Sequence, residues 1–171
     1  MPGRSTFIVE TTEDTWRRSG LETASEDDTV DYIGRVFEKE LGNDTLITNN
    51  SIWRTFPRVK NKNYFHKNIV LMGDALHTAH FSIGSGTKLA MEDAVTLFEA
   101  VNENNHDLNA ALTAFQEKRE PIVNALQRAA QVSMEWFENV ERYHDIMEPM
   151  QFSYSLLTRS PVSYTHLRAH E

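Results

Sequence analysis

The sequence predicts an α/β fold whose carboxyl-terminal part is helical. A short apolar run at residues 69–72 has the composition of a strand buried on both faces, as in a parallel sheet covered by helices. After the glycine-containing segment 73–87, apolar residues recur every three or four positions, which is the period of an amphipathic helix. The same period returns between residues 107 and 140, so the second half of the chain is predicted to be mostly helical.

Composition bounds the function. With 171 residues, 40% of them hydrophobic, the chain is long enough for one domain with a core. Its net charge of −8 argues against nucleic acid as a partner, since phosphate binding needs concentrated Lys and Arg. The absence of cysteine excludes cysteine nucleophiles and metal sites. No apolar run has membrane-spanning length and no secretory signal is visible, so we expect a cytoplasmic protein without a membrane partner.

Three elements are predicted before the apolar run. Residues 6–10 read as a strand, and residues 51–56 alternate as a second strand that Pro57 ends. Residues 29–41 are predicted to be a helix that stops at Gly42. The apolar face of that helix consists of Val30, Ile33, Phe37 and Leu41.

Two helices are predicted after it. Asp107 is a candidate cap for a helix that places Leu108, Ala111, Leu112 and Phe115 on one face. Pro121 suits the first turn of a second, longer helix that ends near Val140. Tryptophan and methionine at helical spacing there are read as core residues.

The junction after the apolar run carries the chemistry. Gly73 lets a ligand approach the backbone, and Asp74, just past the end of the strand, can accept hydrogen bonds from a sugar or polyol hydroxyl. Gly84 and Gly86 permit backbone conformations closed to other residues. The start of the following helix would present amides and a positive dipole end to an anionic group.

That following helix has a predicted cap and a predicted packing face. Ser85 or Thr87 is the candidate cap. The face expected to lie against the sheet consists of Ala90, Ala94, Leu97, Phe98 and Val101. Glu92 and Asp93 are read as carboxylates that complement the helix dipole.

Two other patterns have simpler interpretations. His77 and His80 are three residues apart, but no third ligand occupies a convincing position, so no metal site is expected. A structural role for His77 is nearly as good an interpretation as a ligand-binding one. Basic residues between Asp44 and Asp74 are either a solvated loop or a strip that attracts phosphates, and the solvated loop is the simpler reading. The strip consists of Arg54, Arg58, Lys60, Lys62 and Lys67.

The string NIVLMGDALHTAHFSIGSGTKLAMEDA resembles the second FAD-binding motif of the class A flavoprotein aromatic hydroxylases. Within that class it is most similar to the salicylyl-CoA 5-hydroxylase and anthraniloyl-CoA monooxygenase group. That group shares His80-Phe81 and Lys88, where the wider class has Pro-Pro and Asn. Leu76 replaces a more usual Ala. The flanking sequence also resembles that group, in the segments STFIVETTEDTWRRSGL, SIWRTFPRV, LQRAAQVSMEWFENVERY and FSYSLLTRS.

The resemblance implies hydroxylation of an aromatic CoA ester, such as salicylyl-CoA or anthraniloyl-CoA, with FAD, NAD(P)H and O2. It places His80, Phe81 and Ser82 beside the reactive edge of the flavin, as the residues nearest the chemistry, and places Trp53, Arg54 and Phe56 at the border of the active site. The implied cofactor-binding residues are Gly73, Asp74, Gly84, Ser85, Gly86 and Thr87. A truncated FAD-binding element without activity and a related flavin-dependent reductase remain alternatives.

The resemblance also implies a division of the chain. Residues 1–66 would end the substrate-binding sheet, residues 67–104 would form the second FAD-binding motif, and residues 105–160 would be carboxyl-terminal helices. The Gly-x-Gly-x-x-Gly motif of the family's amino-terminal Rossmann unit does not occur, so we expect a partial fold lacking that unit. Residues 161–171 are expected to be a non-native tail, because VSYTHLRAHE resembles translated sequencing adapter. An old-yellow-enzyme-type reductase domain would follow in the full protein.

Overall fold

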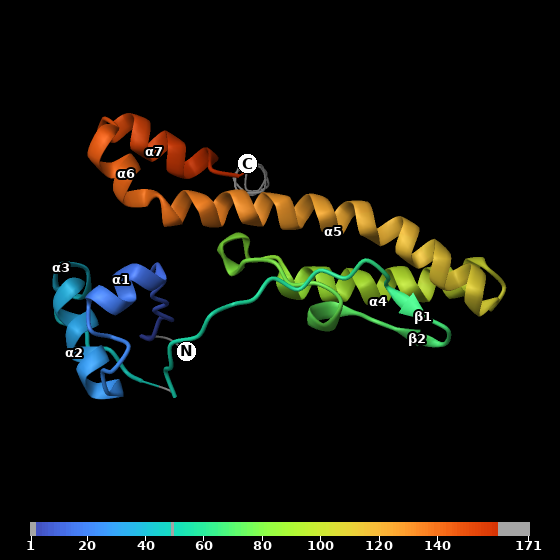
Figure 1. Ribbon diagram of the computed structural model, residues 1–171, viewed down its shortest axis with the longest axis horizontal. Helices are drawn as coiled ribbons and strands as arrows, with labels where there is room; N and C mark the ends of the chain where they lie inside the picture. The colour runs from blue at the N-terminus through green and yellow to red at the C-terminus, as the bar shows by residue number, and fades with distance from the viewer. Residues whose placement is uncertain (1–2, 49, 161–171) are drawn as a thin grey trace. The chain divides into compact units, whose positions relative to one another are not determined.

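The computed structural model describes residues 3–48 and 50–160 of the chain (Figure 1). It divides into two compact units, Met1–Thr55 and Phe56–Glu171, and each is described by itself. The predicted non-native tail at residues 161–171 lies outside the described residues.

The first unit is built from three short helices: α1 (Glu13–Arg18), α2 (Glu26–Val36) and α3 (Glu38–Leu41). The predicted helix over residues 29–41 is confirmed over most of its length, but it starts earlier and is interrupted at Phe37. The earlier start follows from a capping box, in which the Ser25 side chain accepts from the Asp28 N–H. The predicted end at Gly42 is confirmed, because Gly42 has a φ of 57°, which only glycine adopts at little cost.

Both strands predicted for this unit are wrong. Residues 6–10 and 51–56 are extended or irregular but belong to no strand. A strand is stable only when its backbone groups pair with a neighbour, and within the described part of the first unit no segment pairs with either one. Phe7 instead packs edge-to-face against Phe37, with ring centroids 5.2 Å apart. The alternation over residues 51–56 reflects no half-buried face, since Ile52 is 63% exposed.

The second unit begins with a small hairpin. Strand β1 (Phe65–His66) pairs with β2 (Ile69–Val70) in an antiparallel register that sets Phe65 opposite Val70. The apolar run at residues 69–72 therefore forms a strand only over its first two residues, and Ile69 is 64% exposed. The prediction of a parallel sheet buried on both faces is wrong for the described residues. Four apolar residues fit an exposed hairpin edge as well as a central strand, and periodicity does not separate the two.

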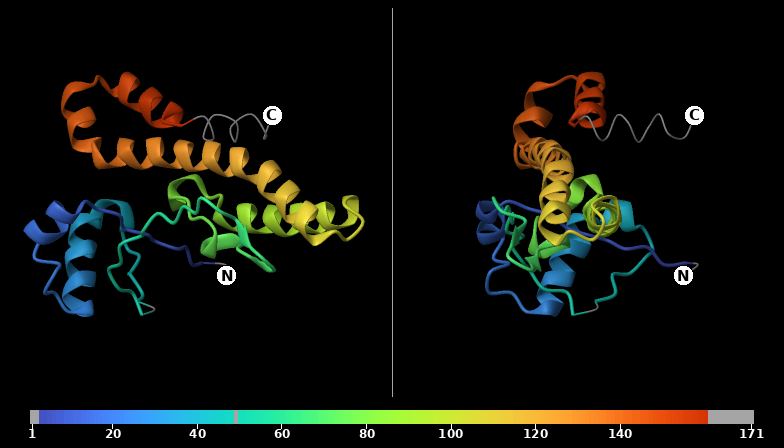
Figure 2. Two further views of the ribbon diagram at one scale, coloured as in Figure 1. Left: turned by 45° about the vertical axis from the view of Figure 1, so that its right-hand side comes forward. Right: turned by 90° about the vertical axis from the view of Figure 1, so that its right-hand side faces the viewer.

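Two long helices form most of the second unit. Helix α4 (Gly86–Glu103) runs beside α5 (Leu108–Glu138), as both views of Figure 2 show. The core lies where these helices meet the hairpin, and its members are Tyr64, Leu76, Ala100, Ala111 and Phe115. The predicted apolar face of α4 is partly confirmed: Leu97 and Val101 pack on this core, whereas Phe98 is 68% exposed.

Helix α5 is one continuous helix. Asp107 caps it as predicted, by accepting hydrogen bonds from the N–H groups of Asn109 and Ala110. Pro121 lies inside the helix, so the prediction that it begins a separate helix is wrong. Both Pro121 and Glu117 are exposed, so water can bond the Glu117 carbonyl that the proline leaves without a donor. Figure 1 shows α5 bending along its length, as expected for a helix with an internal proline.

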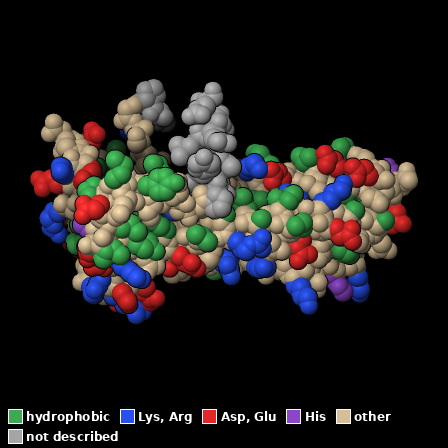
Figure 3. Space-filling view, turned by 90° about the horizontal axis from the view of Figure 1, so that it is seen from above, with side chains coloured by type: hydrophobic (Ala, Val, Ile, Leu, Met, Phe, Trp, Pro, Cys, Tyr) green, Lys and Arg blue, Asp and Glu red, His purple; other side chains and the backbone are tan. Residues whose placement is uncertain are grey.

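The predicted helical carboxyl-terminal part is confirmed. After α5, helices α6 (Val140–Ile146) and α7 (Pro149–Thr158) fold back along it (Figure 1). In Figure 3, hydrophobic side chains gather over these helices. The large exposed ones in this region are Val140, Ile146, Met150, Tyr154 and Leu157. Among the described residues, no helix combines the length and apolar character needed to cross a membrane.

Candidate functional site

Gly73 and Asp74 lie on a single 3-10 turn, η1 (Gly73–Ala75), which packs against α4. Gly73 has a φ of 56°, in the left-handed region that favours glycine, and a Cβ added there would lie 3.4 Å from the Cβ of Ala90. The turn and the helix are therefore in close contact at this point. The Asp74 side chain belongs to an exposed residue.

A buried carboxylate holds this turn in place. Asp93, in the middle of α4, is 0% exposed and accepts a hydrogen bond from the Gly73 N–H, with 3.0 Å between N and Oδ2. The same oxygen accepts a bond from Nε2 of His77, at 2.8 Å. A carboxylate only accepts, so the His77 nitrogen in this bond must carry a proton. One side chain thus fixes both ends of the five-residue segment 73–77.

Arg119 of α5 neutralises Asp93. Its Nε donates to Oδ1 of Asp93 at 2.8 Å, and the side chain is only 2% exposed. The remaining guanidinium nitrogens donate to Glu92 Oε2 at 3.2 Å and to the Leu89 carbonyl at 3.2 Å. Buried charges are stable only when they are paired and hydrogen-bonded, and this pair meets both conditions. The pair joins η1, α4 and α5 at one point.

The dipole interpretation of Glu92 and Asp93 is wrong, because the first turn of α4 holds no acidic residue. Asp93 is buried and bonds several partners, and Glu92 pairs with Arg119 and Lys88. The sequence motifs do not predict the role of Arg119. A signal was present. Asp93 falls between buried Leu89 and Ala100 at helical spacing, and Arg119 falls between buried Phe115 and Val123. Opposite charges on the apolar faces of two helices indicate an ion pair that is buried between the helices.

A parallel set of bonds holds the other side of this segment. The backbone of residues 57–60 runs beside it, with a bridge between Lys60 and His77. The Val59 N–H donates to Oγ1 of Thr78 at 2.7 Å, and Gln127 of α5 donates to the carbonyls of both residues at 2.8 Å. His77 is therefore structural in this arrangement: it is 3% exposed and bonded to Asp93.

The residues predicted to lie nearest the chemistry form a second turn, η2 (Phe81–Ile83). Nδ1 of His80 accepts the Ser82 N–H at 3.3 Å, so the proton of the neutral ring lies on Nε2. The His80 ring stacks on Phe81 with 4.5 Å between centroids, and Phe81, 40% exposed, also meets Phe56 edge-on at 5.5 Å. Ser82 donates to Ser133 of α5 at 3.0 Å. The η2 turn and the residue before it thus carry two stacked aromatic rings, and the Ser82 side chain bonds the turn to α5.

The start of α4 is open on its exposed side. Gly84, with a φ of 62°, and Gly86 have nothing within 4 Å of the position a Cβ would occupy. Ser85 is the N-cap residue, as predicted, but its hydroxyl donates to the Ile83 carbonyl instead of accepting from the helix. Among the described residues no side chain caps the first amides of α4, and Thr87 is exposed beside them. Free amides next to open space fit the polar edge of a flavin nucleotide.

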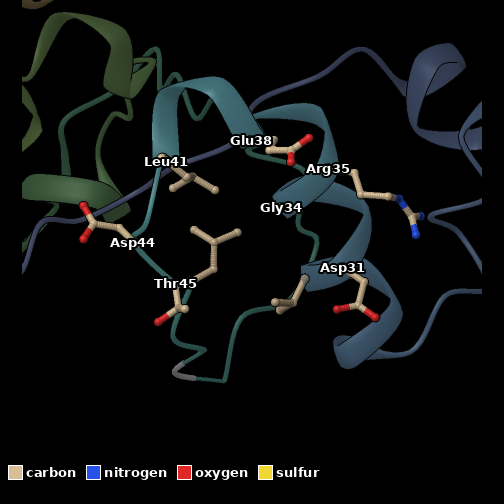
Figure 4. Close-up of a pocket in the computed structure, with 10 residues that line it drawn as sticks. Asp31, Gly34, Arg35, Glu38, Leu41, Asp44 and Thr45 are labelled. Atoms are coloured by element: carbon tan, nitrogen blue, oxygen red, sulfur yellow. The ribbon is translucent and has the colours of Figure 1, made fainter.

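Two hollows lie away from these turns. One of about 410 Å³ belongs to the first unit, and Figure 4 shows it between α2, α3 and the segment that follows. Another, of about 270 Å³, lies between β1 and α5 and is lined by Phe65, Gln116 and Glu120 among others. Neither is lined by a predicted cofactor residue. Among residues 3–48 and 50–160, no three His, Cys, Asp or Glu side chains lie together as metal ligands would.

Electrostatics around the site are set by its ion pairs. The hydrogen bond from Lys88 holds the pKa of the Glu92 carboxyl below its usual value, and Arg119 acts in the same direction. Burial, together with nearby Glu120 and Asp93, raises the pKa of Tyr64 to about 12. The basic strip is exposed at Arg58, Lys60, Lys62 and Lys67. Attraction of phosphates by this strip stays a prediction.

The chain is similar to several known proteins. The family profile described as "FAD binding domain" matches residues 2–130. The chain is 41% identical over 165 residues to a salicyloyl-CoA 5-hydroxylase from a Streptomyces species, covering 91% of this chain and 32% of that protein. It is 38% identical over 138 residues to protodeoxyviolaceinate monooxygenase from Chromobacterium violaceum, covering 80% and 37%.

A third relative is the 3-hydroxy-4-methyl-anthranilyl-[aryl-carrier protein] 5-monooxygenase of Streptosporangium sibiricum. It is 38% identical over 136 residues, covering 80% of this chain and 35% of that protein. The chain therefore spans about a third of the length of each of these relatives. The matched region includes the turn at Gly73 and Asp74, the loop at His80 and the whole of α4. By this match and by the resemblance of its motif, the chain belongs to the family of FAD-dependent aromatic monooxygenases.

Proposed function

We propose that the protein carrying this chain hydroxylates an aromatic ring presented as an acyl-CoA ester, using FAD, NAD(P)H and O2. The observation that carries the proposal is the arrangement around α4. An exposed aspartate lies on a turn packed against that helix, and the helix begins with uncapped amides beside two open glycines. Two relatives whose names specify an aromatic acyl group on CoA or on a carrier protein support the substrate class.

The residues divide into those that hold the cofactor and those that meet the substrate. Asp74 would accept hydrogen bonds from hydroxyls of the ribityl chain, while Gly73 keeps the backbone of η1 close to α4. The amides of Gly86 and Thr87 would stabilise negative charge on the flavin ring. When bound, FAD supplies the redox chemistry between NAD(P)H, O2 and the ring.

The η2 turn would form the wall on the substrate side. Phe81 and the stacked His80 ring offer an apolar face to an aromatic substrate and exclude water from it. The exposed lysines and arginine of segment 58–67 would attract the CoA phosphates.

The cofactor role is tested by replacing Asp74 with Ala or Asn in the full-length protein, with Glu99→Ala on the exposed side of α4 as the matched control. Hydrogen bonds to a charged group contribute about 1.5–3 kcal/mol, so the dissociation constant for FAD should rise roughly tenfold to a hundredfold. Quenching of flavin fluorescence on titration measures it. If Asp74→Ala retains FAD as the control does, the assigned role is wrong.

The reaction is tested with salicylyl-CoA and anthraniloyl-CoA as substrates. Hydroxylation requires O2 uptake equal to the hydroxylated product formed, whereas the alternative flavin-dependent reductase would reduce the substrate without consuming O2. We expect the 171-residue chain alone to show no turnover, since it spans about a third of its relatives. A reductase domain following this unit in the full protein stays a prediction.

A further inference from the structure

Arg159 connects the loop predicted to face the substrate to the carboxyl-terminal helices. Arg159 directly follows α7, and its Nε donates to Oγ of Ser133 on α5 at 3.0 Å. One Nη donates to the Leu156 carbonyl of α7 at 2.9 Å, and the other to the Ser82 carbonyl of η2 at 3.5 Å. The guanidinium also lies 4.9 Å from the centre of the Phe137 ring. One side chain therefore contacts three elements.

Ser133 connects the two partners. It is 0% exposed, and its hydroxyl oxygen accepts one bond from Arg159 and another from Oγ of Ser82, both at 3.0 Å. Ser82 and Arg159 are 77 positions apart in the chain, so no local turn preference produces this contact. The position of Ser82 is thus set by α5 and α7 together.

The orientation of His80 depends on the same contacts. Its ring accepts the Ser82 N–H and stacks on Phe81, so a displacement of Ser82 would turn the ring. Arginine suits this role because its planar group offers five donors in a fixed geometry, whereas lysine offers a flexible point charge.

We infer that Arg159 is a positioning residue, which acts through Ser133 and Ser82 to fix the η2 turn and the His80 ring against the aromatic substrate. This inference rests on the proposed function, since only that function places a substrate at η2. The cofactor contacts at η1 are held by a separate set of residues, Asp93 and Arg119. Loss of Arg159 should therefore disturb η2 while η1 keeps its structure.

The test uses the full-length protein with Arg159→Gln, Arg159→Lys and Ser133→Ala, and with Arg142→Gln on exposed α6 as the matched control. The first readout is hydrogen–deuterium exchange without FAD. We expect residues 80–84 to exchange about tenfold faster in Arg159→Gln and Ser133→Ala, with residues 73–77 unchanged. Arg159→Lys should restore part of the protection, because one of three bonds can be remade.

The second readout separates cofactor binding from chemistry. In Arg159→Gln the affinity for FAD should stay that of the wild type. The hydroxylation rate should fall roughly tenfold to a hundredfold, because the substrate would be held in the wrong position. NAD(P)H oxidation would continue, with O2 reduced to H2O2 by the same two electrons and two protons.

Two outcomes overturn the inference: unchanged exchange at residues 80–84 in Arg159→Gln, or equal acceleration there and at residues 73–77, which would mean a general loss of stability. A wild-type protein that binds no FAD and hydroxylates no aromatic ester would instead refute the proposed function. The exchange result would still decide whether Arg159 positions η2.

Discussion

Asp93→Asn is the sharpest perturbation that the structure offers. The substitution keeps the shape of the side chain and removes its charge. If the amide nitrogen takes the place of Oδ2, it faces the donors of Gly73 and His77, and if it takes the place of Oδ1, it faces Nε of Arg119. In both orientations at least one buried donor meets another donor, and Arg119 keeps only Glu92 as a carboxylate partner on α4.

Breaking a buried pair in this way costs about 3–5 kcal/mol, which is a large part of the roughly 5–15 kcal/mol that stabilises a typical domain. Urea unfolding of the 171-residue chain, followed by far-ultraviolet circular dichroism, measures the loss. Glu99→Gln, on the exposed side of the same helix, is the control and should change stability by less than about 0.5 kcal/mol.

A double-mutant cycle identifies the partner. Arg119→Gln alone should cost a similar amount, and Asp93→Asn with Arg119→Gln should cost clearly less than the sum, with a coupling of about 1 kcal/mol or more. Strict additivity, or a cost below about 1 kcal/mol for Asp93→Asn, would refute the reasoning that this carboxylate and guanidinium depend on each other.

Three further predictions concern two residues of the same unit and one residue of helix α2. Gly73→Ala should destabilise the chain by about 1–3 kcal/mol, because the backbone is in the left-handed region, although the new methyl would only touch Ala90. Gly34→Ala, in the interior of α2 with open space around it, should stabilise by up to about 1 kcal/mol in the same urea assay, and a loss there as large as at Gly73 would contradict the argument. Tyr64 has a folded pKa of about 12 against 10.0 for the free group, so its contribution is present below pH 10 and is lost as pH rises toward 12. Tyr64→Phe should remove that alkaline decline, which amounts to at most about 3 kcal/mol in the free energy of unfolding. Urea unfolding at a series of pH values measures it. An identical decline in the variant would show that the phenol is not its source.

Features that depend on a few neighbouring residues could be predicted from the sequence. Asp107 caps α5 because its side chain reaches amides two and three positions ahead, and Gly42 ends α3 through its own backbone. The sequence motif from Gly73 to Gly86 led to the correct family. The residues assigned to FAD and to the substrate stay predictions.

Features that depend on distant partners could not be predicted. Residues 6–10 and 51–56 have strand-like sequences, but a strand exists only when another segment pairs with it. Pro121 is typical of the first turn of a helix, and helix propensity alone does not indicate that it can lie on the exposed side inside α5. Ser133 bonds Ser82, 51 positions away, and Arg159, 26 positions away. The periodicity of the sequence does not predict contacts over such separations.

Helix α5 carries both residues that fix the ends of the loop, Arg119 for η1 and Ser133 for η2. These residues are 14 positions apart, which is close to four turns, so they lie on one side of the helix about 21 Å apart along its axis. One helix therefore sets the distance between η1, the turn expected to hold the nucleotide, and η2, the turn expected to meet the aromatic ring. Pro121 lies between the two points, so a change in the curvature of α5 at Pro121 would alter that spacing. A substitution that straightened the helix at Pro121 would move one turn relative to the other without touching either.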